Sequence, residues 1–185
     1  MLKYHEFTNW MFDNENPDIE IKSQLPLYAY INDIEYKVLV DHIIINNKLN
    51  TVIPIDLKVS SSQNFYIDFV KYRYYIQSAL YSDVIQKNYP GYNITPFEFV
   101  VARRNNTNNP LRYVCTQNDL RVGRDGGQLR SGRRIKGYKQ LTSEYSWHLE
   151  NDLWDDPKEV YDEKGVFKLN AFDLIEQNSF ANVEF

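Results

Sequence analysis

Residues 36–59 read YKVLVDHIIINNKLNTVIPIDLKV, two β-branched runs on either side of the dipeptide Asn46-Asn47. β-branched residues favour strands, and Asn tolerates the backbone conformations of tight turns. The stretch therefore predicts a β-hairpin with strands over 36–45 and 51–59. Pro54 has no backbone donor, so we expect the second strand to lie at a sheet edge or to be irregular at that point.

The predicted hairpin gathers three charged residues. Asp56 and Lys58 are two positions apart on one strand, so their side chains point to the same face, and the turn brings Asp41 alongside them. Carboxylates bind hard divalent cations, and the carbonyl of Leu57 offers a further oxygen ligand. The pattern predicts a divalent-cation site at which a metal-bound water is activated for phosphodiester hydrolysis and a lysine orients the nucleophile.

The pattern (D/E)-x-K alone is weak, because it recurs in this chain at Glu20/Lys22, Glu35/Lys37, Asp156/Lys158 and Asp162/Lys164. The copy at Asp56 differs in context. It ends a β-branched run and follows, by 15 positions, an aspartate embedded in another such run. The alternative is that these are ordinary strand and surface charges, and the joint context favours the metal site.

A helix is expected next, because residues 65–87 contain neither Pro nor Gly and follow N-cap candidates in SSSQN at 60–64. Gln77 and Tyr81 then share one face at i and i+4, and Arg73 extends this polar row by one turn. The row predicts a polar face on this helix. The alternatives are a helix–sheet contact for Gln77 and Tyr81 and a solvated charge for Arg73.

The remaining segments predict a mixed α/β (α+β) fold, with a central mixed β-sheet flanked by helices. We expect a helix near 4–12, an extended stretch around 24–30, a hairpin over 97–103 and 111–115, and an interrupted helix over 118–150. One domain over residues 1–185 is expected, with its core at about 36–150. The lone Cys115 excludes an internal disulfide and any multi-cysteine zinc site, which suits a packing role in a reducing compartment.

Charge is unevenly distributed along the chain. The net charge is −4, yet residues 103–139 carry 10 basic side chains against only Asp119 and Asp125. Such a block favours binding to a phosphate backbone, and its alternative is a solvated helix and loop. The predicted DNA-binding members are Arg103, Arg104, Arg121, Arg124, Arg130, Arg133 and Arg134, and Lys136 belongs to the same block.

Four segments together resemble a known family: KVLVD at 37–41, IDLKV at 55–59, FVKYRYYIQSALY at 69–81 and FEFVV at 97–101. They are similar to the RecB-like branch of the PD-(D/E)XK nucleases, and within it to phage and prophage exonucleases of the RecE and lambda types. The resemblance implies a restriction-endonuclease-like core. It also implies that Asp41 and Asp56 bind Mg²⁺ or Mn²⁺, that Lys58 is the catalytic lysine, and that Gln77 with Tyr81 orders the site and contacts the DNA strand.

By the same resemblance, we expect a metal-dependent deoxyribonuclease, an exonuclease acting on duplex DNA ends in phage recombination or replication. A homo-oligomer and a single-strand annealing protein as partner are compatible with it. Three departures are left open: the N-terminal part is short for the family, Ser60 stands where Thr is common, and an additional ligand could be His5, Glu6, Glu15 or Glu20.

Two other functions stay open: an endonuclease or repair nuclease on the same fold, and a binding or structural module that keeps the nuclease fold without catalysis. Strand polarity and DNA versus RNA preference are also undecided. No run approaches the roughly 18 apolar residues of a membrane span, and residues 1–10 lack a signal-peptide layout. We therefore expect a soluble cytoplasmic protein, in the host cytoplasm if it is phage-encoded.

Overall fold

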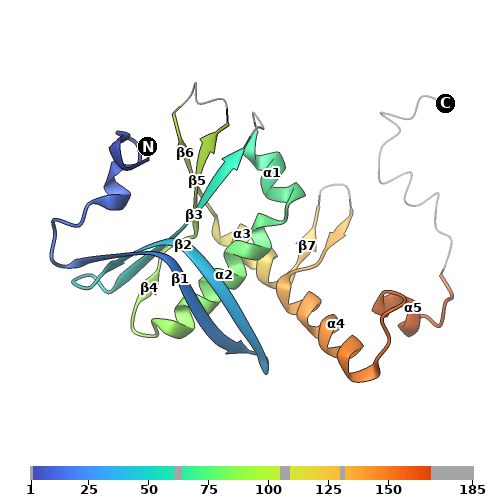
Figure 1. Ribbon diagram of the computed structural model, residues 1–185. Coiled ribbons are helices and arrows are strands. Elements are labelled where there is room, and N and C mark those ends of the chain that lie inside the picture. Colours follow the sequence, from blue (N-terminus) through green and yellow to red (C-terminus); the bar gives the residue numbers. More distant parts are fainter. Residues whose placement is uncertain (1, 61–63, 105–108, 130–131, 168–185) are drawn as a thin grey trace, which may run out of the picture. The chain divides into compact units, whose positions relative to one another are not determined.

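The computed structural model describes residues 2–60, 64–104, 109–129 and 132–167 (Figure 1). It divides into two compact units, Met1–Arg124 and Asp125–Phe185. That residues 1–185 form a single nuclease domain stays a prediction.

The first unit is built on a mixed sheet with strand order β1-β2-β3-β5-β6. These strands span Ile19–Ile31, Ile34–Asn46, Thr51–Ser60, Glu98–Arg103 and Leu111–Val114, and the short β4 (Asn93–Ile94) pairs with the start of β3. The β3–β5 and β3–β4 pairings are parallel and the others antiparallel. The predicted fold class and both predicted hairpins are confirmed.

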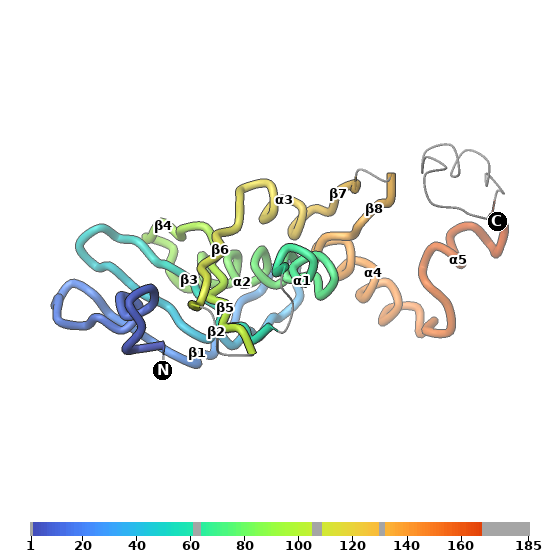
Figure 2. The backbone as a smooth tube through the Cα atoms, turned by 90° about the horizontal axis from the view of Figure 1, so that it is seen from above, coloured from blue at the N-terminus to red at the C-terminus, as the bar shows by residue number. Residues whose placement is uncertain are grey.

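Both faces of the sheet are covered. On one face, α2 (Tyr74–Asn88) packs Val84 and Ile85 against alternate residues of β2 such as Ile43. On the other, Met11 from the N-terminal segment packs against Ile44 and neighbouring strands. Two 3-10 turns, η1 (Leu2–Tyr4) and η2 (Asn9–Phe12), form that segment where one helix was expected. Figures 1 and 2 show the two layers on opposite sides of the strands.

The expected long helix over 65–87 is wrong in one respect: it is two helices, α1 (Phe65–Lys71) and α2, broken at Arg73 in a left-handed conformation (φ 56°). The rings of Phe65 and Tyr74 stack with centroids 5.8 Å apart. In a continuous helix these residues would be separated by about 13.5 Å along the axis, at 1.5 Å per residue. Tertiary packing of the two rings therefore overrides the local helical pattern.

The expected helix over 118–150 is likewise divided at its glycines. α3 (Gln117–Asp125) is followed by a two-stranded ladder of β7 (Gly127–Gln128) and β8 (Arg134–Ile135), then by α4 (Tyr138–Asn151) and α5 (Lys158–Asp162). Gly126 has φ +80°, and a side chain there would come within 2.7 Å of the Ile135 carbonyl oxygen. The chain must bend at this position.

Pro54 lies inside the sheet, because β3 is flanked by β2 and β5. The edge position is therefore excluded, and the alternative, an irregularity, is what the register shows. On the β4/β5 side the ladder pairs Val52 with Ile94 and resumes at Ile55 with Glu98. Ile53 and Pro54 fall in the gap.

His42 and Cys115 have packing roles. The ring of His42 contacts Ser23 Oγ at 3.0 Å and the Met11 carbonyl at 2.7 Å, which ties the N-terminal segment to β2. Cys115 is buried directly after β6 in a cluster with Phe97 and Phe99, and burial raises the pKa of its thiol to about 12. In the part of the chain that is described, no helix is long and apolar enough to cross a membrane.

Gly123 permits α3 to lie directly on α2. A Cβ at this position would lie 1.9 Å from the Tyr75 carbonyl oxygen and 2.8 Å from Ala79 Cβ. We expect Gly123→Ala to lower the free energy of unfolding by about 1–3 kcal/mol, because neither backbone can yield without repacking. Urea denaturation measures this, with Gly91→Ala as control, where a Cβ meets nothing within 4 Å. Equal stabilities of the two variants would contradict the packing.

Stability should also depend on the His42 imidazole. Burial lowers the pKa of His42, against the smaller opposing effect of the Met11 carbonyl. In the unfolded chain the ring takes up its proton near pH 6.5, and the folded chain resists this protonation. The free energy of unfolding should therefore fall as the pH drops below about 6.5. The same titration of His42→Gln should be flatter, and identical curves would contradict the assignment.

Candidate active site

The β2–β3 register places Asp41 beside Asp56. The antiparallel ladder ends at the pair His42–Ile55, and Asp41 and Asp56 are the next residues of the two strands. Asp41 Oδ2 accepts a hydrogen bond of 3.0 Å from the Leu57 amide. The two predicted carboxylate ligands and the predicted carbonyl ligand, that of Leu57, therefore come from adjacent, hydrogen-bonded strands.

Asp56 is the buried centre of this group, with only 3% of its surface exposed. Its Oδ1 accepts a hydrogen bond of 2.5 Å from Gln77 Nε2, and its Oδ2 lies 2.7 Å from Lys58 Nζ. Within the described chain, Oδ2 has no partner with full hydrogen-bond geometry. The carboxylate is thus held firmly through one oxygen and by an ion pair alone through the other.

The charge state of Asp56 reflects several opposing effects. Burial raises the pKa of this carboxyl, and the neighbouring Asp41 charge raises it further. Lys58 and Gln77 lower the pKa by stabilising the ionised form, but burial prevails. A cation placed at this carboxylate would relieve the same penalty, because it favours the ionised form.

Lys58 and Gln77 complete a closed polar network. Lys58 Nζ donates to Gln77 Oε1 at 3.2 Å and lies 4.5 Å from the centroid of the Tyr74 ring. The amide of Gln77 therefore bridges the carboxylate of Asp56 and the ammonium of Lys58. One turn later, Tyr81 is half-buried against Phe97, and burial together with the Asp56 charge raises the pKa of its phenol.

Arg73 does not share the helical face of Gln77 and Tyr81. It precedes α2 at the break with α1, and its side chain is exposed. The expected three-turn row is therefore wrong at its first member, because the polypeptide leaves helical geometry there. A role of Arg73 in DNA binding stays a prediction.

Gln24 is a contributor that sequence reasoning missed. Its Nε2 donates to Asp41 Oδ1 at 3.0 Å, and its backbone is left-handed with φ 51°. The β1–β2 ladder runs through Ser23–His42 and Leu25–Val40 but omits the Gln24–Asp41 pair between them. Strained backbone often marks functional sites. No local pattern marks Gln24, since its importance follows only from the β1–β2 register.

The donors present fit a cation that takes few protein ligands. Mg²⁺ is commonly held by one or two carboxylates, with water and substrate phosphate completing its shell. Asp41, Asp56 and the Leu57 carbonyl supply such a set. Among the described residues no group of three His, Cys, Asp or Glu side chains is placed to hold a metal. Of the N-terminal candidates, His5 contacts Asn109, Glu20 pairs with Lys22, and Glu6 and Glu15 are exposed.

The basic block separates into different environments. Arg124 forms a bidentate ion pair with Asp83, which neutralises its charge. Arg121 donates a hydrogen bond to Asn118 of its own helix. Arg103 ends β5 and the exposed Arg104 follows it. In the second unit, Lys136 is paired with Glu144 and Glu159. Arg133 and Arg134 are exposed there, and Arg130 lies outside the described residues.

Comparisons with known proteins leave the function to be argued from these residues. No protein-family model and no curated protein matches the chain. Among solved structures, it is similar to a protein of Eubacterium rectale provisionally assigned as an exonuclease, with a TM-score of 0.48 and 14% identity. The match covers 88% of this chain and 57% of that one, so this chain spans little more than half of its length.

The pKa of Asp56 should respond to its two charged neighbours in opposite directions. Lys58→Met removes the cation that lowers this pKa, so the pKa should rise further above its usual range. Asp41→Asn removes the charge that raises it, so the pKa should fall. Carboxyl ¹³C NMR titration in the absence of divalent metal measures both. Shifts of the same sign in the two variants would contradict the geometry.

Proposed function

We propose that this protein is a metal-dependent nuclease that hydrolyses DNA phosphodiester bonds. The observation that carries the proposal is the convergence on Asp56: a buried carboxylate with a poorly satisfied oxygen, a second carboxylate hydrogen-bonded to the next residue of the strand, and a lysine in direct contact. Perturbed carboxylates grouped with a charged partner are typical of catalytic centres. Asp41 and Asp56, with the Leu57 carbonyl, would hold Mg²⁺ or Mn²⁺.

The bound cation would supply an activated water and neutralise charge developing on the phosphate. Lys58 presents an ammonium beside Asp56, where it can orient the nucleophile and share the negative charge of the transition state. Gln77 fixes the positions of both side chains, because its amide donates to the carboxylate and accepts from the ammonium. Gln24 holds Asp41 in the same way from the other side. These contacts favour a pre-organised site.

The finer assignment rests on the family resemblance. It favours an exonuclease that degrades one strand from a duplex end during phage recombination or replication. A homo-oligomer that encloses DNA and a single-strand annealing protein that loads on the product belong to the same proposal. Exposed arginines such as Arg104, Arg121 and Arg133 are the candidates for phosphate contacts, whereas Arg124 is already paired.

The direct test is digestion of end-labelled linear and closed circular duplex DNA with Mg²⁺, Mn²⁺ or EDTA. We expect linear DNA alone to be degraded, with no cleavage in EDTA. Asp56→Asn and Lys58→Met should each lower the cleavage rate by about 100-fold or more, the usual cost of removing one group that stabilises a transition state. Lys48→Met, on the exposed β2–β3 turn, is the matched control and should retain full activity.

The other outcomes separate the alternatives. Cutting of the closed circle would replace the exonuclease with an endonuclease on the same site. If folded wild type cleaves neither substrate with either metal, the enzyme proposal fails, and a non-catalytic binding module takes its place. Cleavage that survives Asp56→Asn and Lys58→Met would show that another site is responsible.

A further inference from the structure

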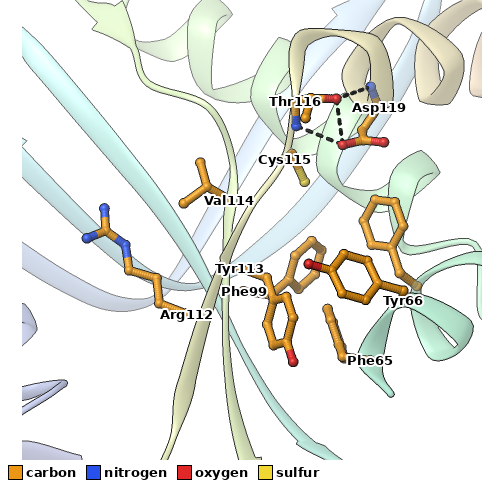
Figure 3. A pocket seen from close by; sticks show the side chains of 10 residues that line it. Phe65, Tyr66, Phe99, Arg112, Tyr113, Val114, Cys115, Thr116 and Asp119 are labelled. Carbon is orange, nitrogen blue, oxygen red and sulfur yellow. Dashed lines mark hydrogen bonds between the residues drawn. The ribbon is translucent and has the colours of Figure 1, made fainter.

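An aromatic cavity lies between α1 and β6, next to the start of α3. Its volume is about 400 Å³ and it opens to solvent. Figure 3 shows the rings of Phe65, Tyr66, Phe99 and Tyr113 gathered on one side of β6, with Thr116 and Asp119 at one end. The group thus joins stackable aromatic faces to a polar edge.

The ring geometry leaves Tyr66 available for stacking. Phe65 and Tyr113 are packed together, with centroids 4.7 Å apart. Tyr66 meets Tyr113 edge to face, with centroids 5.6 Å apart and planes at 89°. Tyr66 is 70% exposed. A large ring kept in solvent at the mouth of an aromatic cavity contributes little to folding and suits a planar ligand.

The cavity is connected to the candidate active site through one ring. Tyr74 stacks on both Phe65 and Phe99 of the cavity, at centroid separations of 5.8 and 5.6 Å. The other neighbour of Tyr74 is Lys58, whose Nζ lies 4.5 Å from its centroid. Phe99 is also the β5 partner of Asp56 in the parallel register. Tyr74 therefore contacts Lys58 and the cavity residues Phe65 and Phe99, which places the cavity one ring away from Lys58.

The polar edge favours a base over a phosphate. The amide and hydroxyl of Thr116 both donate to Asp119 Oδ2 at 2.7 Å, which fixes this carboxylate at the end of the cavity. A carboxylate repels phosphate but accepts hydrogen bonds from the exocyclic amino groups of bases. The nearby Arg112 points away from the rings and forms a bidentate ion pair with Glu98 (Figure 3).

We propose that this cavity binds an unpaired nucleobase, stacked on the face of Tyr66 with its edge toward Tyr113, from the strand held at the candidate active site. The inference rests on the proposed nuclease function and narrows its substrate class. Every base presents a π face but only an unstacked base can insert, so the cavity selects DNA with a single-stranded tail or a frayed end over blunt duplex.

The test is equilibrium binding in EDTA, where a metal-dependent activity cannot consume the ligand. The probes are a duplex with a short single-stranded tail carrying 2-aminopurine and the same duplex with blunt ends. We expect wild type to bind the tailed probe more tightly and to quench its fluorescence. Tyr66→Ala should weaken binding of the tailed probe by roughly 5- to 100-fold, the loss expected for one base–aromatic stack.

Two further variants control this result. Tyr66→Phe keeps the ring and should bind like wild type. Tyr28→Ala removes an exposed tyrosine from β1, outside the cavity, and should also bind like wild type. The base site is overturned if wild type does not prefer the tailed probe, or if Tyr66→Ala weakens tailed and blunt probes equally. It is also overturned if Tyr66→Ala leaves binding of both DNA probes unchanged. An apolar peptide as the natural occupant would give that result.

The proposed base-binding site and the proposed nuclease activity can be rejected independently of each other. The protein could bind the tailed probe through Tyr66 and yet cleave no DNA with Mg²⁺ or Mn²⁺. That result would support the base-binding site and contradict the proposed catalysis. Cleavage could instead require Asp56 and Lys58 but proceed at equal rates on tailed and blunt ends, both in wild type and in Tyr66→Ala. That result would support the nuclease and contradict the base-binding site.

Discussion

A carboxylate inside a β-sheet must be compensated, and the compensation of Asp56 organises the rest of the site. Removing a charge from water is costly unless partners replace its hydration. Asp56 receives an amide from α2 and an ammonium from its own strand, while Asp41 is held opposite it by the Leu57 amide and by Gln24. The site therefore forms only when β1, β2, β3 and α2 all take their native positions. The fold and the candidate chemistry share this constraint.

The core of the fold could be predicted because its signal is local. β-branched runs on either side of Asn46-Asn47 specify a hairpin from neighbouring residues alone, and the two-residue alternation fixes the common face of Asp56 and Lys58. What failed depended on contacts distant in sequence. The break at Arg73 follows from Phe65 packing on Tyr74 and Phe99, and a helical pattern free of Pro and Gly gives no warning of it. Gln24 belongs to the site only because β1 pairs with β2.

The aromatic residues and the arginines also have to be interpreted from tertiary context. Many of the rings form a continuous cluster from Lys58 through Tyr74 to the cavity beside α1, and part of that cluster is exposed at Tyr66. The basic block of the sequence, by contrast, does not act as one surface, since Arg124 and Lys136 are each paired with acids in their own units. Composition identified both groups, and the three-dimensional structure shows that Arg124 and Lys136 are already paired with acids.

The proposed chemistry depends on Asp41 and Asp56 jointly holding a divalent cation, which can be measured as Mn²⁺ binding followed by electron paramagnetic resonance. We expect saturable binding of Mn²⁺ to the wild-type protein, competed by Mg²⁺ and lost in Asp41→Asn and in Asp56→Asn. Lys58→Met should retain the binding or strengthen it, because the ammonium competes for Asp56. Absence of saturable binding to the folded wild-type protein, or binding in both aspartate variants as tight as in wild type, would contradict a shared cation site.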